Sequence, residues 1–237
     1  MQTKELDVVY FVKDGQNEEL TFSLRSVEKN LAHRNVWIYG GKPKEIEPDH
    51  YVHIIQNPNK GTKWDRVRAM FRAVCLNQEI SEDFILFNDD FYVLTPTDKI
   101  SPTYRCGLAE HIITIECNYN DRPTDYSLEL RKTFKKLNEL GLSTLSYELH
   151  TPIILNRHKL LEVMGAFPDE HCTRTLYGNY LALGGNQQKD VKVYKNGQPI
   201  DKTARFLSSE DSTFKTSGVE EYLSELFPEK SKFEKSC

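Results

Sequence analysis

Two adjacent aspartates, Asp89 and Asp90, stand directly after an apolar run of strand length, residues 84–87. Such a run in an α/β sequence predicts a buried strand, and open α/β sheets bind their ligands at the carboxyl ends of these strands. Two buried like charges are unfavourable unless they share a proton or a cation. A divalent metal that carries a phosphorylated ligand would satisfy both. The alternative is that the pair forms an exposed turn or a helix cap.

A second candidate site is the helix N-terminus that follows a basic stretch containing Lys60. Thr62 can cap this helix together with Asp65, three residues later. The backbone N–H groups and the helix dipole favour an anion there, and Lys63 or Arg66 would add charge-assisted bonds to a diphosphate. A basic surface turn is the alternative interpretation.

The loop after the first predicted strand carries Lys13 and Asp14, and Arg25 lies on the helix that follows. In α/β nucleotide-binding domains this loop often holds a base or a ribose, so we expect these residues near a bound nucleotide. Alternatively, Arg25 lies on a solvated helix face with Glu28 as its partner.

Three further side chains are candidates for proton transfer: Glu148, His150 and Asp211. If Glu148 and His150 lie two residues apart on one strand, they project to the same face. That arrangement suits metal ligation or proton abstraction from an acceptor hydroxyl. His150 could equally be a hydrogen-bonded core residue.

The elements that must position these residues follow an α/β order in the first hundred residues. Apolar β-branched runs predict strands, and apolar residues at helical spacing predict helices. Helix followed by buried strand is typical of a mostly parallel sheet flanked by helices. We expect strands at 7–12, 36–39, 51–55 and 84–88, and helices at 20–31 and 62–76.

The second half of the chain is less regular. We expect a single domain over 1–228, with 1–100 as a nucleotide-binding half, and a flexible tail at 229–237. Strands are predicted at 111–116 and 149–155, and helices at 127–140, 156–164 and 219–227.

Composition narrows the function classes. The chain has 237 residues, 38% hydrophobic and 28% charged, which is typical of a globular protein, and its formal charge of -4 argues against binding nucleic acid through net charge. No secretion signal or membrane span is encoded, so we expect a cytoplasmic protein, and its five scattered cysteines indicate reduced thiols. The sequence contains no P-loop motif, no dinucleotide-binding fingerprint and no nucleophile elbow of the kind found in α/β-hydrolases.

Several short blocks agree in order with a known family. They are residues 7–10, 22–30, 36–39, 84–92, 150–152 and 174–180. In these blocks the chain resembles Stealth-type capsular polysaccharide phosphotransferases and small phage-encoded glycosyltransferase-like proteins, over most of residues 5–215. The chain is much shorter than a full Stealth protein and has Asn-Asp-Asp in place of a separated Asp-x-Asp, so the small phage type is the closer relative.

The resemblance implies a GT-A-like single domain that uses Mn²⁺ or Mg²⁺, with 1–100 as the nucleotide-sugar-binding half and 101–228 as the acceptor-side half. By that resemblance Asp90, with Asp89 beside it, would hold the metal against the diphosphate of a nucleotide sugar. Lys63, Asp65 and Arg66 would approach the donor. Arg174, in the last of the blocks, joins Lys13, Asp14 and Arg25 as a donor-binding candidate.

The resulting prediction is a metal-dependent glycosyltransferase, transferring a hexosyl or pentosyl group from a nucleotide-diphospho-sugar to an acceptor hydroxyl. For an inverting reaction Glu148 or Asp211 would take the proton, with His150 as a competing base, whereas a retaining reaction needs no such base. A glycan, DNA or a protein could be the acceptor. Two alternatives stay open: a sugar-1-phosphate phosphotransferase, and a non-catalytic nucleotide- or sugar-binding module.

Overall fold

The computed structural model describes residues 2–55 and 61–235, so the predicted turn at 57–61 and the candidate Lys60 fall largely outside the described residues. Where one domain was expected, the chain gathers into two compact units. The first unit comprises Met1–Ile100, His150–Asn156 and Val191–Cys237, and the second comprises Ser101–Leu149 and Arg157–Asp190. The expected division at residue 100 is a unit boundary, but the chain later returns twice to the first unit.

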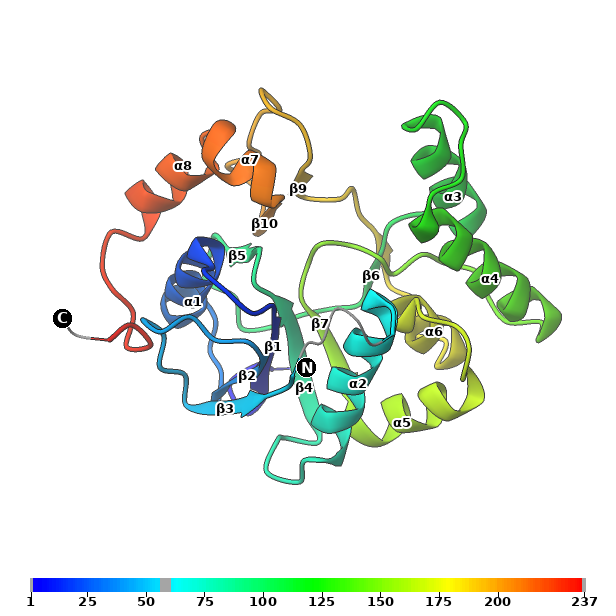
Figure 1. Cartoon of the computed structure of the whole chain (residues 1–237), viewed down its shortest axis with the longest axis horizontal. Coiled ribbons are helices and arrows are strands. Elements are labelled where there is room, and N and C mark those ends of the chain that lie inside the picture. Colours follow the sequence, from blue (N-terminus) through cyan, green and yellow to red (C-terminus); the bar gives the residue numbers. More distant parts are fainter. Residues whose placement is uncertain (1, 56–60, 236–237) are drawn as a thin grey trace. The chain divides into compact units, whose positions relative to one another are not determined.

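The first unit is built on a five-stranded sheet with the order β3-β2-β1-β4-β7 (Figure 1). Strands β1 to β4 run parallel to one another, and β7 at the edge of the sheet pairs antiparallel with β4. This confirms the predicted fold class, an α/β fold with a mostly parallel sheet flanked by helices. The strands are β1 (Asp7–Val12), β2 (Val36–Gly40), β3 (His50–His53), β4 (Asp83–Asn88) and β7 (Ile153–Asn156).

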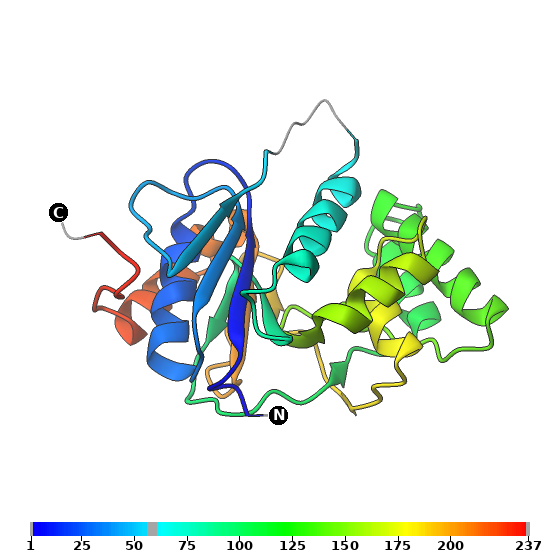
Figure 2. The ribbon, with the colours of Figure 1, turned by 90° about the horizontal axis from the view of Figure 1, so that it is seen from below.

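Two helices cover opposite faces of this sheet, α1 (Glu18–Asn30) and α2 (Lys63–Leu76) (Figure 2). Alternate residues of β1 join one hydrophobic core with Leu24 of α1. On the other face Phe11 of β1 packs edge-on against Phe71 of α2, with ring centroids 4.8 Å apart. Strand β1 is therefore buried on both faces, which explains its continuous apolar sequence.

A second, three-stranded sheet in the first unit has the order β5-β10-β9. Its strands are β5 (Phe91–Val93), β10 (Phe206–Ser209) and β9 (Lys192–Val193). Along the chain, β10 is followed by α7 (Asp211–Thr216) and α8 (Val219–Leu226). The predicted helix at 219–227 is thus confirmed. Strand β5 begins directly after Asp90, so the two aspartates form the junction between the two sheets.

The C-terminal segment differs from the flexible tail expected at 229–237. Within its described part, Phe233 is 1% exposed and belongs to the core of the first unit. Glu234 accepts two hydrogen bonds from Arg25, each 2.7 Å long, and a third from the backbone N–H of Ser231. The buried Phe233 side chain and the Arg25–Glu234 ion pair thus hold this segment against the first unit, although its lysine-rich sequence is typical of a solvated chain end.

The second unit contains four helices and a short parallel pair of strands within its described residues. The strand expected at 111–116 is wrong, since these residues belong to a helix. Leu108, His111, Ile112 and Glu116 are buried at helical spacing, because this helix packs against the next one. The elements are β6 (Thr103–Tyr104), α3 (Leu108–Cys117), α4 (Asp125–Glu139), α5 (Arg157–Ala166), α6 (Thr173–Tyr180) and β8 (Asn186–Gln187).

The helices expected at 127–140 and 156–164 are confirmed as α4 and α5. The strand expected at 149–155 begins only at Ile153, after Pro152, so Glu148 and His150 do not lie on a strand. No helix within the described part of the chain has the length and apolar character needed to cross a membrane.

Candidate active site

Asp89 and Asp90 lie in a turn at the carboxyl end of β4, inside the first unit, with Asp90 buried and Asp89 half-buried. Asp90 is 9% exposed, so the exposed turn considered as an alternative is not what forms. Strand β4 is an interior strand between β1 and β7, and β5 continues the chain into the second sheet. The predicted placement of the two carboxylates at a buried strand end is confirmed.

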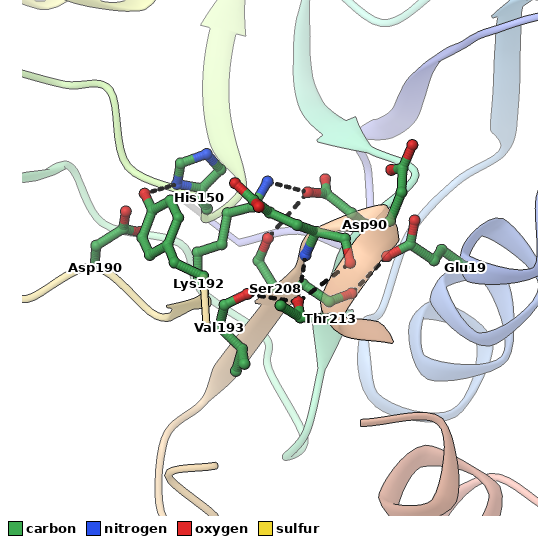
Figure 3. A network of polar contacts seen from close by, with 12 residues as sticks. Glu19, Asp90, His150, Asp190, Lys192, Val193, Ser208 and Thr213 are labelled. Carbon is green, nitrogen blue, oxygen red and sulfur yellow. Dashed lines mark hydrogen bonds and ion pairs between the residues drawn. The ribbon is translucent and has the colours of Figure 1, made fainter. Parts of the chain in front are cut away.

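Within the described part of the chain, one of the two oxygens of Asp90 has hydrogen-bond partners and the other has none. Oδ2 accepts from the Lys192 ammonium at 3.0 Å and from the Ser208 hydroxyl at 3.1 Å (Figure 3). Oδ1 is buried and has no hydrogen-bond partner among residues 2–55 and 61–235. A buried carboxylate oxygen without a partner carries a desolvation cost of about 1–3 kcal/mol, so an additional cationic or hydrogen-bonding ligand at Oδ1 would be favourable.

Asp89 is held by the residue that caps α1. The Asn17 amide donates to Asp89 Oδ2 at 2.5 Å, while its own carbonyl oxygen accepts from the Leu20 N–H of the first helical turn. Burial, reinforced by the charge of Asp90, raises the pKa of Asp89 to about 6. The ionised form of Asp89 is therefore costly in this fold.

A third carboxylate, Glu19 in the first turn of α1, belongs to the same charged region. It accepts a hydrogen bond of 2.6 Å from Ser209, whose hydroxyl also lies 3.0 Å from that of Tyr92. Burial, with the charges of Asp90, Asp211 and Asp89, raises the pKa of Glu19 to about 7. Sequence reasoning missed Glu19, because an acid in a first helical turn is ordinarily explained by the helix dipole.

The arrangement fits a cation held by two carboxylates. Asp89 and Asp90 are adjacent, and their like charges repel each other. Asp90 also offers a buried oxygen that has no partner within the described residues. Across residues 2–55 and 61–235, no three His, Cys, Asp or Glu side chains form a ready-made metal cage. A cation here would complete its coordination with oxygens of water or of a phosphorylated ligand, as Mg²⁺ commonly does.

Lys13, Asp14 and Asp211 lie on exposed loops and helix ends of the first unit. Lys13 is 3.8 Å from Asp211, and Asp14 is 3.9 Å from His53 of β3. These weak exposed pairs leave the side chains available to a ligand. The structure thus brings two predicted residues, Lys13 and Asp211, next to each other.

The alternative of a solvated helix face with Glu28 as partner is wrong for Arg25, whereas its donor-binding role stays a prediction. Its guanidinium forms a bidentate ion pair with Glu234 and also donates to the Phe227 carbonyl at 3.1 Å. Both side chains of the pair are largely buried, at 16% and 9% exposure. Arg25 therefore anchors the C-terminal segment.

The N-terminus of α2 has the capping box that the sequence predicts. The Thr62 hydroxyl accepts from the Asp65 N–H, and the Asp65 carboxylate accepts from the Thr62 N–H at 2.6 Å. Asp65 thus serves as a cap, while the Lys63 ammonium lies 4.5 Å from the centre of the Trp64 ring. Arg66 is 3.5 Å from the Gly61 carbonyl.

His150 lies in the first unit, where its ring packs edge-on against Phe91, the residue after Asp90. Its Nδ1 is 3.2 Å from the Tyr194 hydroxyl (Figure 3). Glu148 belongs to the second unit, where it accepts from the Thr175 N–H at 3.2 Å and so caps α6. Arg174 is on α6 of the second unit, so among His150, Glu148 and Arg174 it is His150 that shares a unit with the aspartates.

No family model and no curated protein matches this chain, so the resemblance to the Stealth-type and phage proteins stays a prediction. Among solved structures, the chain is similar to the glycosyltransferase GlyE of Streptococcus pneumoniae TIGR4, with 8% identity and a TM-score of 0.37 over 95% of this chain and 50% of that one. The apo form of GlyE matches with 9% identity and a TM-score of 0.35, over 78% and 45%. The chain spans about half the length of these structures, and likeness at this level carries no functional argument.

Proposed function

We propose that this protein is a metal-dependent glycosyltransferase that uses a nucleotide-diphospho-sugar donor. The observation that carries the proposal is the buried Oδ1 of Asp90, next to Asp89 at the carboxyl end of an interior β-strand, for which the described part of the chain supplies no hydrogen-bond partner. Open α/β sheets bind ligands at this position, and paired carboxylates suit a divalent cation that bridges to a diphosphate. The blocks that resemble the glycosyltransferase-like family agree with this assignment.

In this mechanism Asp89 and Asp90 would hold Mn²⁺ or Mg²⁺. When bound, such an ion supplies a Lewis acid that stabilises the charge developing on the departing diphosphate. Lys13 is the exposed cation nearest in sequence to the cap Asn17, and it can approach a phosphate from the loop after β1. Lys63 and Arg66 at the start of α2 remain the other donor-binding candidates.

For the acceptor, the proposal keeps the candidate bases that share a unit with the aspartates. His150 contacts Phe91 beside Asp90, and its Nδ1 is oriented by the Tyr194 hydroxyl. Asp211 is exposed at the start of α7. Either could accept the proton of an acceptor hydroxyl. Glu148, which caps α6, is the weaker candidate.

A screen of nucleotide sugars for Mn²⁺-dependent donor hydrolysis tests the proposal. The pair to compare is wild type and Asp90→Asn, which keeps the side-chain shape and removes the charge. We expect a loss of about 100-fold or more. Asp98→Asn is a matched control, because Asp98 is exposed and outside the site. Equal hydrolysis by wild type and Asp90→Asn would refute the role of Asp90.

The products separate the alternatives. Release of a nucleoside diphosphate supports glycosyl transfer, whereas release of a nucleoside monophosphate would instead indicate transfer of a sugar phosphate. Donor affinity without any turnover, at every metal concentration, would indicate a binding module.

A further inference from the structure

Lys192 is a charged residue of the site that neither the sequence motifs nor the proposed function uses. It lies on β9 and is paired in register with Ser208 of β10. These cross-strand neighbours deliver two donors to the same carboxylate oxygen, Oδ2 of Asp90. The Lys192 side chain is 13% exposed and that of Asp90 is 12% exposed, so the ion pair is largely shielded from water.

The way Lys192 contacts Asp90 is unlike that of an ion pair that serves stability alone. A structural pair in a buried position is favourable when the remaining lone pairs of the carboxylate also find partners. Here both donors converge on Oδ2, while the buried Oδ1 receives no hydrogen bond from any residue that the structure describes. The second sheet therefore fixes the orientation of Asp90 and leaves one oxygen for another ligand.

Lys192 also changes the charge that a cation would meet. Asp89 and Asp90 together carry up to two negative charges, and the Lys192 ammonium, 3.0 Å from Oδ2, compensates one of them. A divalent cation at Oδ1 would be repelled by this ammonium, and the repulsion is strong because the surroundings are poorly solvated. Lys192 thus opposes the binding of the cation that the two carboxylates favour.

We propose that Lys192 is a positioning residue that holds Asp90 in place before the cation binds and sets the affinity of the site for a free divalent cation. The inference rests on the metal role in the proposed function. In the absence of the cation, Lys192 stabilises Asp90 in its working orientation. When the cation binds, the fixed positive charge weakens its binding and favours its exchange.

Binding of Mn²⁺ alone tests this inference, by titrating the protein and measuring the free ion by electron paramagnetic resonance. Lys192→Met is one atom shorter, keeps an unbranched side chain and removes its charge, so Mn²⁺ should bind about tenfold or more tightly. Lys192→Arg keeps the charge and should retain wild-type affinity. Lys195→Met is the matched control, because Lys195 is an exposed lysine three residues later.

Thermal unfolding gives a second readout. Lys192→Met leaves the Asp90 carboxylate without its cation, so Mn²⁺ should raise the melting temperature of this variant more than that of wild type, by linkage. If Lys192→Met is poorly folded, Lys192→Gln keeps a donor for Oδ2 and should still bind Mn²⁺ more tightly. Unchanged or weaker Mn²⁺ binding by a folded, uncharged variant overturns the inference.

These outcomes are distinguishable from those of the proposed function. If wild type hydrolyses a nucleotide sugar and Lys192→Met gains no Mn²⁺ affinity, only the role of Lys192 is refuted. If no nucleotide sugar is hydrolysed but Lys192→Met binds Mn²⁺ more tightly, the cation site and Lys192 stand, and the glycosyltransferase proposal fails.

Discussion

Replacing Asp89 by asparagine should make the protein more stable while removing a residue that the proposed reaction needs. Burial and the charge of Asp90 raise the pKa of Asp89 from 3.8 to about 6. An acid whose pKa is raised by folding binds its proton more tightly in the folded state, so its ionisation reduces stability. Asparagine is close in shape, has no charge, and its carbonyl oxygen can still accept the Asn17 hydrogen bond.

The magnitude follows from the two pKa values. Since one pKa unit corresponds to about 1.4 kcal/mol, a rise from 3.8 to about 6 corresponds to about 3 kcal/mol. This loss of stability is absent below a pH of about 4, develops as the pH rises towards about 6, and is complete above it. Asp89→Asn should therefore unfold with a free energy about 3 kcal/mol higher than wild type at about pH 8, and with nearly the same free energy at about pH 4.

Urea denaturation of both proteins at the two pH values measures this difference. Mn²⁺ should stabilise wild type more than Asp89→Asn, because the variant lacks one of the two carboxylates. A variant that is less stable than wild type at about pH 8, or a gain that is equally large at about pH 4, would refute the reasoning. A confirmed gain would show that the fold keeps a destabilising charge at this position, which is typical of functional sites.

Two further predictions concern packing away from the carboxylates. Arg25→Met should lower the free energy of unfolding by about 3 kcal/mol, since it leaves the Glu234 carboxylate buried without its cation. Urea denaturation measures this loss. In the Arg25→Met background, Glu234→Gln should lower the free energy of unfolding only a little further. If the losses of the two single variants were fully additive in the double variant, the ion pair would be contradicted. Gly178→Ala should lower the melting temperature although alanine favours helices, because its Cβ would overlap with the Tyr147 ring. The same change in a Tyr147→Leu background should be neutral or stabilising, and an equal loss in both backgrounds would exclude the clash.

The local sequence was sufficient for those features whose partners lie close along the chain. Strand β1 spans the predicted residues 7–12, because a continuous apolar run is needed where a strand is covered on both faces. The Thr62–Asp65 capping box is encoded within four residues and is present. The same holds for the placement of Asp89 and Asp90 at the end of a buried strand.

Local patterns were misleading where distant contacts decide the structure. Residues 111–116 are rich in β-branched side chains, yet they form a helix because packing against α4 buries Leu108, Ile112 and Glu116 on one face. Arg25 resembles a solvated helix residue, but its partner Glu234 lies 209 residues later. Neither contact leaves a periodic signal in the sequence.

The sequence by itself determined the α/β order of the first hundred residues and the position of the carboxylate pair, because both depend on short-range hydrophobic patterns. Only the tertiary structure decided what those carboxylates contact. Lys192 and Ser208 reach Asp90 from 102 and 118 residues away, and Ser209 reaches Glu19 from 190 residues away. The charge balance of the site depends on how the second sheet is placed against the first, and no local sequence pattern encodes that placement.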